Sequence, residues 1–79
     1  MSLRKIKEME IYKSKTDSHY YIVDRVGSSN VFKYYRNFVL FRRIDNPHLK
    51  FVASLNEFKK SFRKVTKLER MLIRIKFGI

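Results

Sequence analysis

Cysteine is absent from this chain of 79 residues, so the fold cannot depend on disulfides or on thiolate-bound zinc. Tryptophan is absent as well, so the core must be built around seven phenylalanines and five tyrosines. Long apolar runs are also missing, because the longest, Phe38–Phe41, is far shorter than the roughly 20 residues of a membrane span. We therefore expect one small domain, located in the cytoplasm, whose core is aromatic.

Acidic residues are scarce, with seven Asp and Glu against nineteen Lys and Arg, which leaves a formal net charge of +12. The basic residues are densest near the C-terminus, where the segment 59–76 contains a single acid, Glu69. An imbalance of this size attracts polyanions, and we expect a nucleic acid to be the partner. An acidic surface on another protein is the alternative that the same charge allows.

The first two thirds of the chain contain short runs typical of β-strands, which alternate or are rich in aromatic and β-branched residues. These runs span residues 9–13, 20–26, 31–35, 38–44 and 49–53. Polar clusters at 15–18, 27–30 and 45–48 are turn signals that separate them. Short strands at this spacing predict an antiparallel sheet of four or five strands that curls into a small barrel or folds onto one face.

After residue 54 the spacing of the apolar residues changes from two to three or four, which predicts helical structure. Two capping boxes, Ser54–Glu57 and Thr66–Glu69, mark candidate helix starts. A capping box inside a helix would find its amides already bonded, so we expect a helical turn at 55–61, a short strand near 62–65 and a separate helix from Thr66. One unbroken helix is the alternative, since neither glycine nor proline interrupts the segment.

The apolar residues of the two C-terminal segments fall on one face of each predicted helix. Leu55, Phe58 and Phe62 form the first set, and Leu68, Leu72 and Ile75 form the second. We expect Phe58 and Phe62 to lie in the core together with Phe51 from the preceding strand. The second set predicts an amphipathic helix over 66–77 that packs its apolar face and turns its basic face outward.

The order of these elements resembles that of small SH3-like barrels found in short proteins of bacteriophages and mobile elements. The resemblance covers residues 9–65 and includes the stretch Leu55–Val65, whose Glu-Phe, Phe and Lys-Val positions follow the one-turn helix that closes such barrels. The chain departs from the pattern at Ser18-His19-Tyr20, where such families carry a glycine and a bulky aromatic. The helix after Thr66 lies outside it. The resemblance implies a mainly β fold, a phage or mobile-element origin and a binding role, and with that origin the location would be the cytoplasm of a bacterial host cell.

Residues that could carry catalysis or hold a metal are few and scattered. The only histidines, His19 and His48, lie in separate turns without ligand spacing, so we expect no metal and no other cofactor. No serine lies in a nucleophile elbow, and the carboxylates occur singly. A nuclease built from Asp24, Asp45 and a lysine is the remaining enzymatic alternative, and we expect a non-enzymatic protein.

Basic side chains are the candidate nucleic-acid contacts. The main set consists of Lys59, Lys60, Arg63, Lys64, Lys67, Arg70, Arg74 and Lys76. A secondary set, in which basic and aromatic residues alternate, consists of Lys33, Tyr34, Arg36, Arg42 and Arg43. On a helix, Lys67, Arg70 and Arg74 lie in a line away from the apolar face, so we expect contacts to the backbone with modest sequence preference. The helix could also lie on a membrane surface, but we expect a nucleic acid or an acidic host protein in preference.

Overall fold

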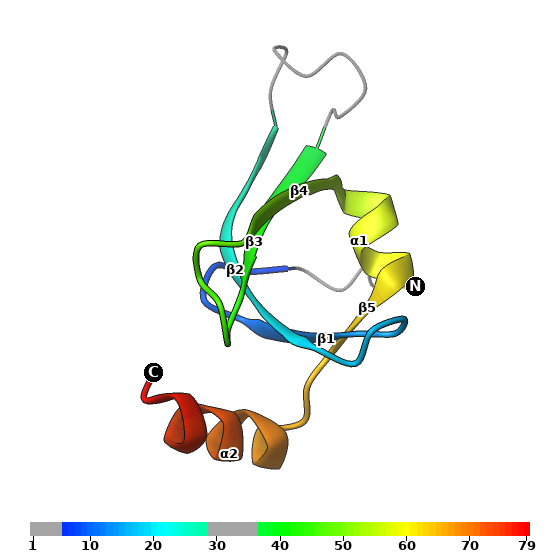
Figure 1. Ribbon diagram of the computed structural model, residues 1–79. Coiled ribbons are helices and arrows are strands. Elements are labelled where there is room, and N and C mark those ends of the chain that lie inside the picture. Colours follow the sequence, from blue (N-terminus) through cyan, green and yellow to red (C-terminus); the bar gives the residue numbers. More distant parts are fainter. Residues whose placement is uncertain (1–5, 29–36) are drawn as a thin grey trace.

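A five-stranded antiparallel sheet and two helices make up the computed structural model, which describes residues 6–28 and 37–79 (Figure 1). The elements are β1 (Ile11–Ser14), β2 (Tyr20–Ser28), β3 (Asn37–Arg43), β4 (Lys50–Ser54), α1 (Leu55–Ser61), β5 (Phe62–Lys64) and α2 (Lys67–Phe77). The predicted antiparallel sheet is therefore confirmed. The predicted run 31–35 lies outside the described residues.

The strand order is β4-β3-β2-β1-β5, so the chain meanders through four strands and then returns to the first. The return is made by α1, which places β5 beside β1 with Tyr12 opposite Lys64 and Ser14 opposite Phe62. A β-bulge on β2 shifts the register at Asp24, because Val23 lies opposite Phe41 and Arg25 lies opposite Leu40. A bulge of this kind bends and twists the strand, and the sheet curls accordingly (Figure 1).

The turn from β1 to β2 contains a residue in an uncommon backbone conformation. Ser18 has a φ of 62°, in the left-handed region that favours glycine. The backbone at this turn therefore has the conformation that a glycine would adopt without strain, although the residue is a serine. Asp17 stabilises the turn by accepting hydrogen bonds from the backbone amide of His19 and from the hydroxyl of Tyr21, both of 2.9 Å.

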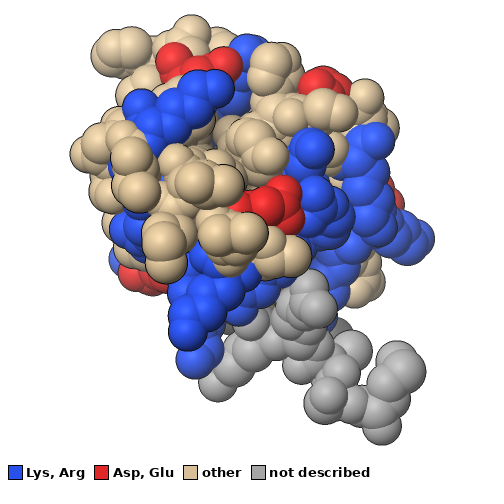
Figure 2. All heavy atoms as spheres, turned by 90° about the horizontal axis from the view of Figure 1, so that it is seen from below, with Lys and Arg blue, Asp and Glu red and all other residues tan. Residues whose placement is uncertain are grey.

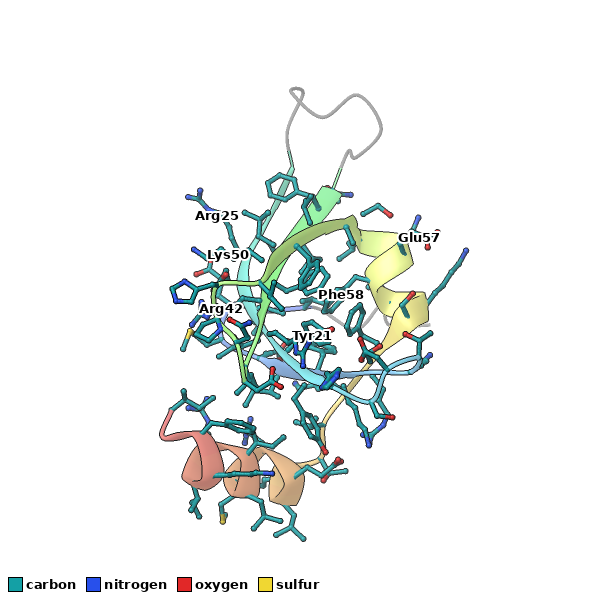
Figure 3. The ribbon with its side chains drawn as sticks, viewed as in Figure 1. Tyr21, Arg25, Arg42, Lys50, Glu57 and Phe58 are labelled. Atoms are coloured by element: carbon teal, nitrogen blue, oxygen red, sulfur yellow. The ribbon has the colours of Figure 1, made fainter. Side chains whose placement is uncertain are left out.

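One hydrophobic core lies on the concave side of the curled sheet, which we call the inner face. Its buried residues are Ile6, Tyr12, Tyr21, Val23, Val39, Phe41 and Phe58. Phe58 of α1 is completely buried, with its ring centroid 5.0 Å from Tyr12 and from Phe41 and 4.5 Å from the stacked ring of Phe62 (Figure 3). The expected core position of Phe58 is confirmed, and Phe62 is partly buried against the same cluster.

Phe51 is the exception among the expected core phenylalanines, because 41% of its surface is exposed. Its ring stacks on Phe41 at 5.5 Å and contacts the edge of Tyr21 at 5.8 Å. It lies on β4, which is an edge strand of the sheet, so no neighbouring strand covers its other side. The expectation that Phe51 is buried was therefore wrong.

A second core lies on the opposite side of the sheet, the outer face, where α2 packs. It consists of Ile11, Ile22, Val65 and Ile73, with Tyr20, Ile44 and Phe77 packed around them. Ile11 and Tyr12 belong to different cores because successive side chains of a strand point to opposite faces. The two helices therefore cover opposite faces of one sheet.

The break between α1 and α2 follows the prediction, and the alternative of one unbroken helix was wrong. At α2 the complete capping box forms: the Thr66 hydroxyl accepts from Glu69 N, and the Glu69 carboxylate accepts from Thr66 N, both at 3.2 Å. At α1 the Ser54 hydroxyl accepts from Glu57 N at 3.2 Å. Gly78, with a φ of 68°, ends α2 in the left-handed conformation that glycine adopts readily.

Candidate nucleic-acid interface

The eight basic residues of the main predicted set are divided among three elements. Lys59 and Lys60 are on α1, Arg63 and Lys64 are on β5, and Lys67, Arg70, Arg74 and Lys76 are on α2. Because α1 and α2 pack against opposite faces of the sheet, the eight side chains do not form one continuous line (Figure 1).

Both basic residues on β5 are paired with carboxylates. Arg63 donates two hydrogen bonds, of 3.2 and 3.1 Å, to the two carboxylate oxygens of Glu69. Hydrogen bonding from Arg63, and then from Thr66 N, lowers the pKa of Glu69 to about 2. Lys64 Nζ lies 2.6 Å from Glu10 Oε2, so neither β5 cation is left to balance an outside anion.

Glu10 is the more buried of these two carboxylates, and its environment combines opposing effects. Burial alone would raise its pKa, but hydrogen bonds from Lys64, from Lys7 N and from the Tyr12 hydroxyl together hold the pKa below its ordinary value. The last two bonds measure 2.7 and 3.1 Å. The carboxylate therefore stays charged and ties β5 to the segment before β1.

The two described members of the secondary set, Arg42 and Arg43, are also paired with carboxylates. Arg42 forms an ion pair with Asp24 at the bulge of β2. Arg43 donates two hydrogen bonds to Asp45, of 2.7 and 3.0 Å, and these lower the pKa of the Asp45 carboxyl. Both carboxylates of the alternative nuclease site are thus bound by arginines. Lys33, Tyr34 and Arg36 lie outside the described residues.

The apolar face of α2 does not pack on the sheet, contrary to expectation. Leu68, Leu72 and Ile75 are 66%, 58% and 74% exposed, and Met71 beside them is exposed as well. We call these four residues the apolar stripe. The side chain that α2 buries most is Ile73, with Phe77 packed beside it.

Contacts at the start of α2 set which side of the helix faces the sheet. Glu69 is held on the side of the helix that faces the protein, because it bonds both Thr66 N and Arg63 on β5. At about 100° per residue, Ile73 and Phe77 follow Glu69 by one and two turns on that side, whereas the apolar stripe points in the opposite direction.

The cations of α2 differ from those of β5. Lys67 and Lys76 are exposed and Arg70 and Arg74 are half-buried along the side of the helix. In the described part of the chain, none of the four forms an ion pair with a carboxylate. Figure 2 shows the side of the molecule that α2 occupies, on which Lys and Arg side chains outnumber acidic ones and lie between areas of uncharged surface.

Two further cations, which are not among the predicted contacts, lie on the outer face. Sheet register places Ile22, Arg42 and Lys50 side by side across β2, β3 and β4, and Arg25 follows on β2 (Figure 3). Arg25 and Lys50 are exposed and, within residues 6–28 and 37–79, form no ion pair. Because Ile22 belongs to the core under α2, this cationic row begins where the helix contacts the sheet. The alternation of residues along β4 could have placed Lys50 on the outer face from the sequence alone. The position of Arg25 depends on the β-bulge at Asp24.

Among the described residues, no three His, Asp or Glu side chains come together as metal ligands, and no helix has the length and apolar composition to cross a membrane. Comparisons of the chain with protein-family models, with curated proteins and with solved structures found no match.

Proposed function

We propose that this protein is a non-enzymatic nucleic-acid-binding module that contacts the phosphate backbone with its outer face. The basic surface consists of Arg25, Lys50, Lys67, Arg70 and Arg74. We further propose that the fold is a small SH3-like barrel, of the kind found in proteins of bacteriophages, acting in the cytoplasm of a bacterial host cell. The strand order and the position of α1 between β4 and β5 support this assignment of the fold.

One observation carries the proposal: the outer face carries exposed cations on β2 and β4, the helix α2 that packs on this face carries further cations, and none of these has a carboxylate partner among the described residues. A cation that is already paired gains little from an added anion, whereas an unpaired one can replace a counterion at a phosphate. Along α2, Arg70 and Arg74 are separated by about 6 Å of helix axis, and their side chains are long enough to reach neighbouring phosphates.

The placement of the aromatic residues favours contacts to the backbone over contacts to bases. Within the described residues, Phe51 is the only aromatic side chain that is largely exposed, and it is directed toward the inner face. The other described aromatic rings are buried or half-buried, most of them in the two cores. Proteins that bind single strands by stacking require accessible rings, so electrostatic contacts to phosphates account better for this surface.

The salt dependence of binding tests the proposal directly. If the five cations meet phosphates of a DNA duplex, log affinity should fall against log salt with a slope of about −4.5. The triple variant Lys50→Gln, Arg70→Gln, Arg74→Gln should reduce the magnitude of that slope by about 3 units. Fluorescence anisotropy with labelled duplex DNA, single-stranded DNA and RNA, from about 50 mM salt upward, measures both quantities.

A matched control removes the same charge from the other side of the molecule. Lys15, Lys59 and Lys60 are partly or fully exposed near α1, where Lys15 N donates to Ser61 O, and all three can be changed to Gln. This control should weaken binding much less than the outer-face triple. Equal losses would show that net charge and not the outer face binds nucleic acid. No binding to any of the three nucleic acids would reject the proposal and favour an acidic surface of a host protein as the partner.

A further inference from the structure

The apolar stripe of α2 is accounted for neither by the fold nor by the nucleic-acid proposal. Its four aliphatic side chains follow one another at positions i, i+3, i+4 and i+7 and cover about 100° of the helix circumference. They point away from the sheet, since Ile73 and Phe77 occupy the side that packs. An exposed, continuous apolar surface on a small domain indicates that something else covers it.

Basic side chains border the apolar stripe on both sides. At 100° per residue, Lys67 and Arg74 lie along one edge and Lys76 lies along the other. The only acid of α2 is Glu69, which faces the protein and is bound by Arg63. The outward half of α2 is therefore apolar in the middle, cationic at both edges and free of carboxylates.

These charges argue against a second copy of the chain as the occupant. In a symmetric contact between two α2 helices, the cationic edges of one helix would lie beside those of the other, and each chain carries a formal charge of +12. The stripe is also small, with four residues against the roughly 20–30 that each side of a stable protein interface contributes. It lacks the Trp, Tyr and Arg anchors that dominate binding energy at protein interfaces, because its members are Leu, Met, Leu and Ile.

We propose that α2 lies flat on an anionic membrane surface, with the apolar stripe among the lipid chains and Lys67, Arg74 and Lys76 at the headgroups. A helix that lies in a membrane interface has this distribution of apolar and basic residues. The long basic side chains can extend from the helix to the phosphates while their methylene groups stay in the apolar layer. In Figure 1, α2 forms one edge of the molecule, so a flat surface can meet it along its whole length.

The sequence alone favoured a nucleic acid over a membrane surface as the partner, and it predicted that the apolar face of α2 packs on the sheet. In the structure that face is exposed. The inference does not depend on the proposed nucleic-acid binding. The two proposals share Lys67 and Arg74, but phosphates of a nucleic acid require cations only, whereas a lipid surface requires the apolar stripe as well.

The absence of cysteine allows the contact to be probed at single positions. An environment-sensitive fluorophore is attached to Ile75→Cys in the stripe, or to Lys59→Cys on α1 as the control. With vesicles of 70% phosphatidylcholine and 30% phosphatidylglycerol, we expect the emission of the probe at position 75 to shift to the blue and that at 59 to stay unchanged. Equal responses at both positions, or none at 75, would overturn the proposal.

A second experiment separates insertion of the stripe from electrostatic adsorption. The variant Leu68→Gln, Ile75→Gln replaces two exposed residues, so it should fold as the wild type does. We expect it to bind the anionic vesicles at least tenfold more weakly in co-sedimentation, while its affinity for duplex DNA changes less than twofold. Vesicle binding that is unaffected by these substitutions would refute insertion. A concentration-dependent dimer that the variant abolishes would identify a second copy as the occupant and would also reject the membrane.

Discussion

The helices α1 and α2 have similar N-terminal caps but lie in different environments. Each follows a Ser or Thr whose hydroxyl caps the amide of a Glu three residues later. The apolar residue in the middle of α1, Phe58, is fully buried between Tyr12 and Phe41. On α2, by contrast, the main apolar face is exposed and the smaller one, with Ile73, is packed.

The comparison shows that a helical period and the direction of its apolar face are separate properties. A cap determines where a helix begins, and the period determines which residues share a face. Which face meets the sheet depends on how the chain enters the helix. For α1 the entry comes directly from β4, and for α2 the ion pair between Arg63 and Glu69 turns the acid toward the protein.

We expect the largest loss of stability when the buried ring of Phe58 is removed from α1. Phe58→Ala should lower the free energy of unfolding by about 3–5 kcal/mol, because the ring fills the center of the inner core and leaves a cavity. For a domain this small, such a loss should leave much of the protein unfolded. Urea denaturation followed by circular dichroism measures the change. A midpoint near that of the wild type would mean that α1 does not close the core.

The orientation of α2 about its own axis is tested by two substitutions that lie only two residues apart. Ile73→Ala should lower the free energy of unfolding by about 2–4 kcal/mol, because Ile73 is buried against Ile11 and Ile22. Ile75→Ala serves as the matched control and should change stability by less than about 0.5 kcal/mol, because its side chain is exposed. The same denaturation experiment applies. If the control cost more than Ile73→Ala, the apolar stripe would be packed and the membrane proposal would lose its basis.

The smallest effect that we expect concerns the charge of Glu69. Its pKa is lowered from an ordinary 4.5 to about 2, so the folded state binds this proton less readily than the unfolded state. The stabilisation is therefore fully present above pH 4.5 and is lost as the pH falls from 4.5 toward 2. Glu69→Gln keeps a side chain that can cap Thr66 N but removes the charge.

Thermal melting of the wild type and of Glu69→Gln between pH 6 and pH 2 measures this contribution. The wild type should melt at the higher temperature near pH 6, and the two curves should converge as the pH approaches 2. A difference in melting temperature that is independent of pH would show that the carboxylate charge does not hold α2 in place. The other lowered carboxyl pKa values, those of Glu10, Asp17 and Asp45, are common to both proteins and cancel in the comparison.

Much of the fold could be predicted from the sequence because its signals are local. Alternation and aromatic content marked the strands around Tyr21 and Phe41, and the two capping boxes separated α1 from α2 correctly. Phe51 was misplaced because its neighbours in the sequence do not reveal that β4 would become an edge strand. The position of a strand within a sheet is a property of pairing between distant segments.

The candidate interface was less predictable, for a similar reason. The sequence identified basic residues, but not which of them would meet an acid. Lys64 and Glu10 are brought together only when β5 pairs with β1. Arg63 and Glu69 are six residues apart and meet where the chain passes from β5 into α2. Arg25 reaches the cationic row through the β-bulge of β2, which no short stretch of sequence encodes.

By itself the sequence determined the net charge, the strands, the two capped helices and the apolar and basic faces of α2. These properties depend on residues within a few positions of one another, through hydrogen bonds at helix ends and the geometric periods of strand and helix. Only the tertiary structure decided which cations are neutralised, that Phe58 is buried while Phe51 is not, and that the apolar stripe faces outward. Those outcomes depend on contacts between segments, such as the packing of Phe58 against Tyr12 and Phe41 and the packing of Ile73 against Ile11 and Ile22.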